Sequence, residues 1–261
     1  MDQIIIEKSD DSLLTILLNR PDMVNALNLP LAQALTKSLK RAAQDPAIRA
    51  VVLRGSGGTF SAGGDLKFMK EHRKESKKNF LEISQYLNEA VKSITAMPKP
   101  VVAAVEGHAY AAGFGLAISC DMVVAKTSAM LSPSFLNIAL SPNAGTTYFL
   151  PRILGPKRAM EAFIRAQAFT ATEAHHVGMV NHVWEDSLFD DNLKELTDDL
   201  IRRPSQSLGR VKKLMNQTYQ ASLTDQLALE RKEIAASSTS EDFEEGVTAF
   251  VEKRRPIFNG K

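Results

Sequence analysis

The sequence "PKPVVAAVEGHAYAAGFGLAISCDMVVA", residues 98–125, carries the clearest structural pattern in the chain. Five apolar residues at 101–105 follow a Pro-x-Pro start, which predicts a buried strand. Glycine and alanine then lead into an apolar helix that we expect from about Gly113 to Ser119, and another short apolar run follows at 121–126. A strand, a turn and a helix in this order favour a βα unit of an α/β sheet.

The small side chains between residues 109 and 115 allow two interpretations. The first turn of a helix exposes free backbone N–H groups at the positive end of its dipole, and small residues let a ligand approach that backbone closely. The turn could therefore hold a polarised or anionic oxygen. Alternatively, the small residues permit a tight contact between helix and sheet. The stretch has no GxGxxG pattern and the chain has no GxxxxGK[ST] motif, which disfavours nucleotide binding of those types.

Further strands and helices alternate on both sides of this stretch. Residues 4–21 predict two short strands around an "SDDS" turn, and residues 48–55 predict a buried strand. The segment before Pro46 has helical spacing, with Leu31, Leu35 and Leu39 on one face. Residues 79–95 predict an amphipathic helix, and residues 60–78 predict a loop that becomes polar and basic. The pattern over residues 1–185 predicts an α/β fold with helices covering a sheet.

From residue 186 the pattern is entirely helical. We therefore expect two regions, residues 1–185 and a helical C-terminal region at 186–261. The sequence "SSTSE" before the last predicted helix suggests a capping box formed by Ser238 and Glu241.

Composition and charge narrow the functional classes. The chain has 261 residues, a formal net charge of +2 and one cysteine, Cys120. This charge gives no bulk argument for nucleic-acid or membrane binding. The chain lacks a secretory leader pattern and an apolar run of membrane-spanning length, so we expect a cytoplasmic protein. The pair His175–His176 has no further ligand spacing, and we expect no metal site.

A second glycine-rich turn, "FSAGGDL" at residues 60–66, follows the strand that ends at Gly55. Two such turns, each at the end of a sheet strand, would place two backbone donors on the same edge of the sheet. That arrangement suggests an oxyanion hole built from two N–H groups that are distant in sequence.

Several longer motifs now point to one family. They are "NRPDMVNALN" (19–28), "FSAGGDLKFM" (60–69), the stretch at 98–125, "LSPNAGTTYFLPRILG" (140–155), "AFTATEAHHVGMVNHV" (168–183) and "GVTAFVEKRRPIF" (246–258). In this order the chain resembles the crotonase family of enoyl-CoA hydratases and isomerases. The C-terminal "RRPIFNGK" is similar to the branch of ring-epoxide phenylacetyl-CoA isomerases. The resemblance implies a ββα spiral core with a C-terminal helical region that builds homotrimers, often stacked as hexamers.

The resemblance also implies roles for individual residues. The backbone N–H groups of Gly64 and Ala112 would hold the thioester oxygen of an acyl-CoA. Ala112 stands where many relatives have glycine, but it retains its N–H. Other implied roles fall into two groups. Coenzyme A, which is part of the substrate rather than a separate cofactor, would contact Ser61, Ala62, Gly63 and Lys67, and also Phe250 and Lys253 of a neighbouring subunit. The acyl pocket would include Phe135, Tyr110 and Gly115.

The expected catalytic acids are missing. Hydratases of the family carry two glutamates, and the matching positions here are Gly115 and the pair Ser134–Phe135. Isomerases carry a carboxylate where this chain has Asn143, an amide with no useful base near neutral pH. His108 could act as a base, although a structural role is favoured, and Asp65 is expected to stabilise its turn.

Three functions stay open. The first is double-bond isomerisation of an enoyl-CoA, with Asn143 orienting water or a polar substrate group. The second is decarboxylation of a malonyl-type CoA ester, because loss of CO₂ itself creates the enolate. The third is acyl-CoA binding without catalysis.

Overall fold

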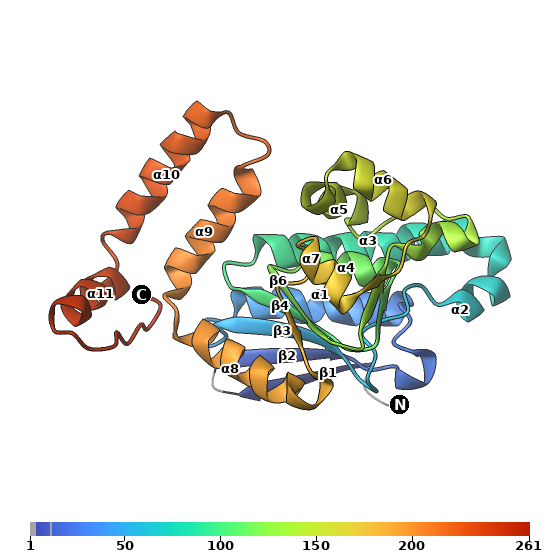
Figure 1. Ribbon diagram of the computed structural model, residues 1–261, viewed down its shortest axis with the longest axis horizontal. Coiled ribbons are helices and arrows are strands. Elements are labelled where there is room, and N and C mark those ends of the chain that lie inside the picture. The colour runs from blue at the N-terminus through green and yellow to red at the C-terminus, as the bar shows by residue number, and fades with distance from the viewer. Residues whose placement is uncertain (1–3, 11) are drawn as a thin grey trace.

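The computed structural model describes residues 4–10 and 12–261, and in that part a six-stranded sheet forms the centre of the fold (Figure 1). Its strand order is β1-β2-β3-β4-β6-β9. The bounds are β1 Ile5–Asp10, β2 Leu13–Leu18, β3 Ala50–Gly55, β4 Val101–Val105, β6 Met122–Lys126 and β9 His182–Trp184. Strands β1 and β2 are antiparallel, and every later pairing in this sheet is parallel. The predicted strands around "SDDS" are confirmed, although Asp11 of that turn lies outside the described residues.

A second sheet of three short strands has the order β5-β7-β8. Its strands are β5 His108–Tyr110, β7 Met130–Ser132 and β8 Phe169–Thr170. Strand β5 begins three residues after β4 ends, so the turn at Glu106–Gly107 passes the chain from one sheet to the other.

Helices cover both faces of the large sheet, because both sets of alternate side chains on its central strands include buried apolar residues. Val51, Leu53 and Ala103 face the larger core, with α1 (Leu29–Gln44), α3 (Ser76–Ala96) and α4 (Ala112–Ser119). Val52 and Val102 face the other way, against α8 (Phe189–Arg202). The period-2 alternation of β3 and β4 thus supplies two separate cores.

The remaining helices extend from this core. Their bounds are α2 Leu66–Glu71, α5 Thr146–Leu154, α6 Pro156–Ile164, α7 Ala171–His176, α9 Ser205–Gln217, α10 Leu223–Ser237 and α11 Glu241–Val251. Short 3-10 turns occur at Pro21–Met23, Arg73–Glu75, Ser134–Ile138 and Asp186–Leu188. Figure 1 shows α9, α10 and α11 standing away from the sheet, whereas α8 lies on it. The helical region expected from residue 186 therefore begins with a helix that packs on the core.

Two local predictions were wrong. Residues 60–78 do not form one loop, because α2 begins at Leu66 and α3 begins at Ser76. The cause is Asp65, whose side chain accepts a hydrogen bond from the N–H of Phe68 and so caps α2. Likewise, α11 is capped by Ser240, which accepts from the N–H of Phe243, while Ser238 ends α10.

Across residues 4–10 and 12–261, every helix is too short or too polar to cross a lipid bilayer.

Candidate functional site

A cavity of about 460 Å³ lies between α3, the turn that follows β3 and the start of α4. Its wall is mostly apolar and includes Leu87, Phe80 and Leu140. Four of the residues predicted for the site line it, namely Gly64, Ala112, Phe135 and Asn143. They come from three separate parts of the chain, which the fold brings together.

The turn that carries Gly64 is held by backbone hydrogen bonds on both sides of that residue. Leu27 N–H donates to Gly63 O at 2.6 Å, and Asp65 N–H donates to Leu27 O at 3.2 Å. Gly63 has φ +91°, and a Cβ there would lie 2.8 Å from Tyr110 O, so only glycine fits. Within the described residues, the N–H of Gly64 donates to no protein group.

The second backbone donor lies at the start of α4. Ala111 N–H donates to Ser132 O at 2.9 Å, and Ala111 itself has φ +47°, an uncommon value for alanine. This backbone conformation starts α4 at Ala112, the first helical residue, whose N–H has no intrahelical acceptor. No other described group accepts from it. Ala112 is not among the residues with positive φ, so alanine suits this position without strain.

The tight-contact interpretation of the small residues at 109–115 is supported at Gly113, and the ligand-binding interpretation stays a prediction. A Cβ at Gly113 would lie 2.7 Å from the Cβ of Ser61, so α4 packs directly on the turn that carries Gly64. Gly64 and Ala112, which lie near this contact in the two segments, both line the same cavity.

Asn143 lies on the loop before α5 and contacts α3. Its Nδ2 donates to Ser84 Oγ at 3.2 Å, while its Oδ1 is buried without a hydrogen-bond partner in the described residues. The backbone O of Asn143 accepts from the hydroxyl of Thr146 at 2.6 Å, which fixes the loop. The amide is therefore held in place, with one of its two polar atoms unused by the protein.

Phe135 and the other two residues predicted for the acyl pocket differ in placement. Phe135 is buried in the 3-10 turn Ser134–Ile138 and lines the cavity. Neither Tyr110 nor Gly115 is among the lining residues. A Cβ at Gly115 would lie 2.5 Å from Thr146 Oγ1 and 2.7 Å from Ala144 O. The position that holds a glutamate in hydratases is thus packed against the loop before α5.

The residues predicted for coenzyme A lie in two places. Ser61 is buried, and its hydroxyl donates to Asn25 O at 2.8 Å and accepts from Gly63 N–H at 3.2 Å, which stabilises the turn. Ala62 and Lys67 are exposed near the cavity turn. Phe250 is 85% exposed on α11, with Lys253 just beyond it, at the opposite end of the molecule from α2 (Figure 1). One chain does not bring these two groups together.

The cavity has little charge. Among the described residues that line it, none is Asp, Glu or His, and Lys77 is the sole charged side chain. Asp65 lies beside the cavity turn but is bound to Arg20 at 2.9 Å and caps α2, as its structural role requires. His108 is exposed and does not line the cavity.

Two ionisable groups outside the cavity, Glu106 and Cys120, have pKa values shifted by their surroundings. Burial alone would raise the pKa of Glu106, but hydrogen bonds from Arg54 at 2.6 Å and from Lys126 at 2.5 Å hold it below its usual value. Burial raises the pKa of the Cys120 thiol, which makes it a poor nucleophile near neutral pH.

The lining residues that sequence reasoning did not name include the polar residues Lys77 and Ser84. Both lie on α3, and both belong to the face at i, i+3, i+4, i+7 and i+10 that also carries Phe80, Leu81 and Leu87. The available signal was a serine on an otherwise apolar face of the predicted helix at 79–95. Lys77 fell within the segment predicted as a loop.

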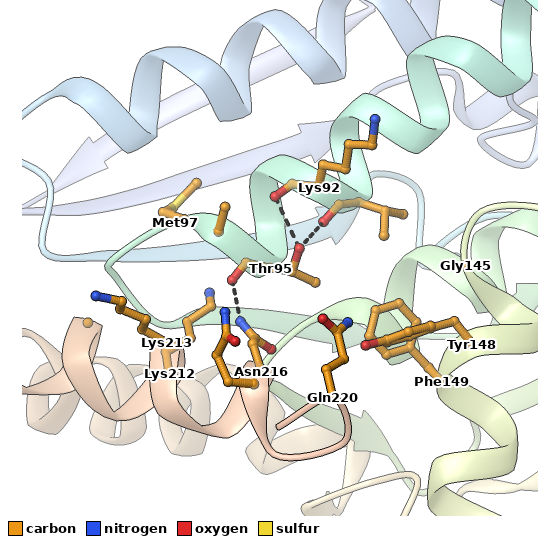
Figure 2. Close-up of a pocket in the computed structure, with 14 residues that line it drawn as sticks. Lys92, Thr95, Met97, Gly145, Tyr148, Phe149, Lys212, Lys213, Asn216 and Gln220 are labelled. Atoms are coloured by element: carbon orange, nitrogen blue, oxygen red, sulfur yellow. Dashed lines mark hydrogen bonds between the residues drawn. The ribbon is translucent and has the colours of Figure 1, made fainter. Parts of the chain in front are cut away.

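A separate cavity of about 490 Å³ lies between α3, α5 and α9 (Figure 2). Its basic side chains already have partners: Lys92 contacts Glu89, Lys212 contacts Asp121 and Lys213 contacts Glu233. Asn216 Nδ2 donates to Thr95 O at 2.8 Å, as Figure 2 shows. None of the predicted site residues lines this cavity, which lies at the junction of core and C-terminal helices.

Comparison with known proteins agrees with the motifs. The family model for enoyl-CoA hydratase/isomerase matches residues 8–261. The chain is 34% identical to 1,2-epoxyphenylacetyl-CoA isomerase of Escherichia coli over the full length of both proteins. It is 37% identical to a probable enoyl-CoA hydratase of Rhodobacter capsulatus, over 96% of each protein. It is 29% identical to trans-2-decenoyl-[acyl-carrier-protein] isomerase of Streptococcus mutans, over 98% of each.

Solved structures show the same architecture. An enoyl-CoA hydratase from Polaromonas has a TM-score of 0.93 and 33% identity, over 97% of this chain and 99% of that one. An enoyl-CoA hydratase from Bacillus anthracis also has a TM-score of 0.93, with 28% identity over 99% of this chain and 100% of that one. The crotonase fold expected from the motifs is confirmed, and the chain belongs to the enoyl-CoA hydratase/isomerase family.

Proposed function

We propose that this protein is an enoyl-CoA isomerase that stabilises a thioester enolate with the backbone N–H groups of Gly64 and Ala112. The observation that carries the proposal is that both N–H groups border one cavity and neither has a protein acceptor among the described residues. Unpaired backbone donors at a cavity are what a developing oxyanion needs, and one such donor contributes about 10²–10³ in rate.

The chemistry follows from this geometry. A 3-enoyl-CoA loses a proton from its α-carbon, and the electron pair moves to the thioester oxygen between the two N–H groups. Return of a proton to the γ-carbon gives the 2-enoyl-CoA. Asn143 has no proton-accepting atom near neutral pH, so water carries the proton and Asn143 orients it. Coenzyme A belongs to the substrate, and the reaction needs no other cofactor.

A decarboxylase is the second candidate. The observation that favours it is the lack of carboxylate and imidazole groups among the described lining residues, because decarboxylation needs no base. In a malonyl-type CoA ester the bond from the α-carbon to the carboxylate breaks, CO₂ leaves and the electron pair forms the enolate. Water then protonates the α-carbon. The same two N–H groups would stabilise this enolate.

Exchange of the α-proton separates these candidates. The protein is incubated in D₂O with saturated and 3-unsaturated acyl-CoA esters, and the ester mass is followed over time. Deuterium uptake and conversion of the 3-enoyl ester support the isomerase. Acyl-CoA binding without uptake overturns it, and malonyl-type esters then distinguish a decarboxylase, which releases CO₂, from a binder, which leaves every ester intact.

The same proposal extends to assembly and location. Helices α9, α10 and α11 expose many apolar side chains, among them Leu223, Ile234 and Val251, and exposed apolar patches mark protein interfaces. We infer a homotrimer, alone or stacked as a hexamer, in which Phe250 and Lys253 reach the coenzyme A held by a neighbouring subunit. A cytoplasmic location fits this assignment.

A further inference from the structure

Lys77 is the sole charged side chain among the described residues that line the cavity with Gly64 and Ala112. It is exposed, and it has no carboxylate within ion-pair distance in the described part of the chain. The neighbouring wall is apolar, with Met69, Phe80 and Leu81. An ammonium group without a carboxylate partner attracts a negatively charged group, and an apolar acyl chain does not provide one.

The position of Lys77 on α3 separates it from the reacting end of the cavity. Ser84, which binds Asn143, lies seven residues further along the same helical face. At 1.5 Å per residue, this places the two residues about 10 Å apart along the helix axis. Ser84, with Asn143 bound to it, thus lies about two turns of α3 from Lys77, which is in the first turn of that helix.

The charge pattern at the start of α3 strengthens this preference. The positive end of a helix dipole favours acidic residues in the first turn, yet the first turn of α3 contains none, and the side chain of Glu75 makes no capping hydrogen bond. Lys77 and Lys78 instead add positive charge to an end that is already positive. An anion bound at this end of the cavity would interact favourably with both the dipole and Lys77.

From these observations we propose that Lys77 selects acyl-CoA substrates whose acyl group carries a carboxylate at the end remote from the thioester. This inference rests on the proposed function, since the thioester must bind at Gly64 and Ala112 for the remote end to reach Lys77. The apolar wall between the two ends contacts the methylene chain. The carboxylate is distinct from that of a malonyl-type ester, which would lie beside the thioester.

Binding constants test the proposal. Dicarboxylic acyl-CoA esters are compared with monocarboxylic esters of equal length, from succinyl and butyryl to adipyl and hexanoyl, by isothermal titration. Lys77→Met should weaken binding of the best dicarboxylic ester by about fivefold, the scale of a partly exposed ion pair, and change its monocarboxylic match by less than about twofold. Lys77→Glu should reverse the preference. Lys78→Met, one residue along and outside the cavity lining, should leave the ratio of the two constants unchanged.

Each contrary result has a separate meaning. If Lys77→Met weakens both esters and free coenzyme A equally, Lys77 contacts the phosphates of coenzyme A and the proposal is overturned. Unchanged constants for both esters overturn it as well. In either case the proposed function survives if the monocarboxylic ester still binds and exchanges its α-proton. If the unmodified protein binds no acyl-CoA, the proposed function fails and this inference fails with it.

Discussion

Asn143 stands where the resemblance to isomerases implies a carboxylate. The substitution Asn143→Asp replaces the amide nitrogen by oxygen and leaves the shape of the side chain nearly unchanged. One carboxylate oxygen would occupy the buried Oδ1 position, which has no partner in the described residues, and the other would face Ser84. Such a carboxylate can act as a general base, a role worth about 10²–10⁴ in rate.

We therefore expect Asn143→Asp to increase α-proton exchange and isomerisation of a 3-enoyl-CoA by about 10²-fold or more. The measurement is the initial rate of each reaction at saturating ester. Asn143→Leu is the matched control, because it keeps the volume but offers no proton acceptor, and its rates should not rise. An aspartate variant no faster than the leucine variant would contradict the isomerase assignment.

The site could be predicted only in part at this scale. Gly64 and Ala112 would act through backbone N–H groups, which every residue except proline has, so residue identity alone does not predict this role. The resemblance of whole motifs placed them, and the cavity brings them together with Phe135 and Asn143. Packing decides the rest. Gly115 was expected in the acyl pocket, but its small size serves a contact with Thr146 and Ala144, which no single segment reveals.

At the scale of elements, the start of α4 determines whether a second backbone donor exists. Ala112 is the first helical residue, where proline is tolerated because its missing N–H has no intrahelical acceptor. Ala111 has φ +47° and ψ −117°, away from the extended region that a following proline favours. Ala112→Pro therefore removes the proposed donor and also adds strain at Ala111.

We expect Ala112→Pro to lower kcat for isomerisation by about 10²–10³. Thermal unfolding and the affinity for a saturated acyl-CoA serve as controls, because they show whether the variant is still folded and still binds the ester. Full activity in a folded variant would exclude the N–H of Ala112 from the oxyanion hole.

The elements themselves follow from the sequence where apolar periodicity is strong. The helices predicted before Pro46 and at 79–95, and the strand at 101–105, are confirmed because each buries a continuous apolar face. The basic segment at 67–78 has no such face. Its helix α2 depends on the Asp65 cap, and Asp65 is in turn held by Arg20, 45 residues earlier in the chain. A local sequence pattern does not predict a contact between residues so far apart in the chain.

Helix α9 is attached to the core through Lys212. Its ammonium donates to the Asp121 carboxylate at 2.6 Å, to Ile94 O at 2.6 Å and to Lys99 O at 3.2 Å. Burial raises the pKa of Asp121 above its usual value, and Lys212 opposes that shift. In Lys212→Met the carboxylate loses its cation, so its pKa in the folded state rises further.

The destabilisation caused by Lys212→Met should therefore depend on pH. Below about pH 4 the carboxyl is protonated in both folded and unfolded states, and little of this effect remains. As the pH rises through the elevated pKa, the folded state must ionise a carboxyl that has lost its cation, and the loss should grow to about 1 kcal/mol near neutral pH, the scale of a solvent-screened ion pair. Urea unfolding at pH 4.5 and pH 8 measures it. The double variant Asp121→Asn/Lys212→Met should lose the pH dependence, and a persisting dependence would assign it to another group.

At the scale of the whole molecule, alternation of strands and helices predicts the α/β class but not the arrangement. The order β1-β2-β3-β4-β6-β9 and the transfer of β5 to a second sheet depend on contacts between distant segments. The sequence likewise does not predict that α8, unlike the later helices, packs on the sheet. Its sequence resembles that of the other C-terminal helices, yet Phe189 and Leu193 close the second core while α9–α11 remain largely exposed.

The exposed apolar side chains of α9–α11 are expected to form the interface between subunits. In aqueous solution, side chains such as Ile234 and Val251, 71% and 73% exposed in one chain, are expected to be buried between subunits. Light scattering should give a mass three or six times the 28.6 kDa of one chain.

Ile234→Asp/Val251→Asp places carboxylates in that interface and should shift the mass toward a single chain, because buried unpaired charges are strongly unfavourable. Leu188→Asp, an exposed apolar position outside α9–α11, should leave the mass unchanged. A single-chain mass for the unmodified protein would exclude the trimer, and with it the contribution of Phe250 and Lys253 to a neighbouring site.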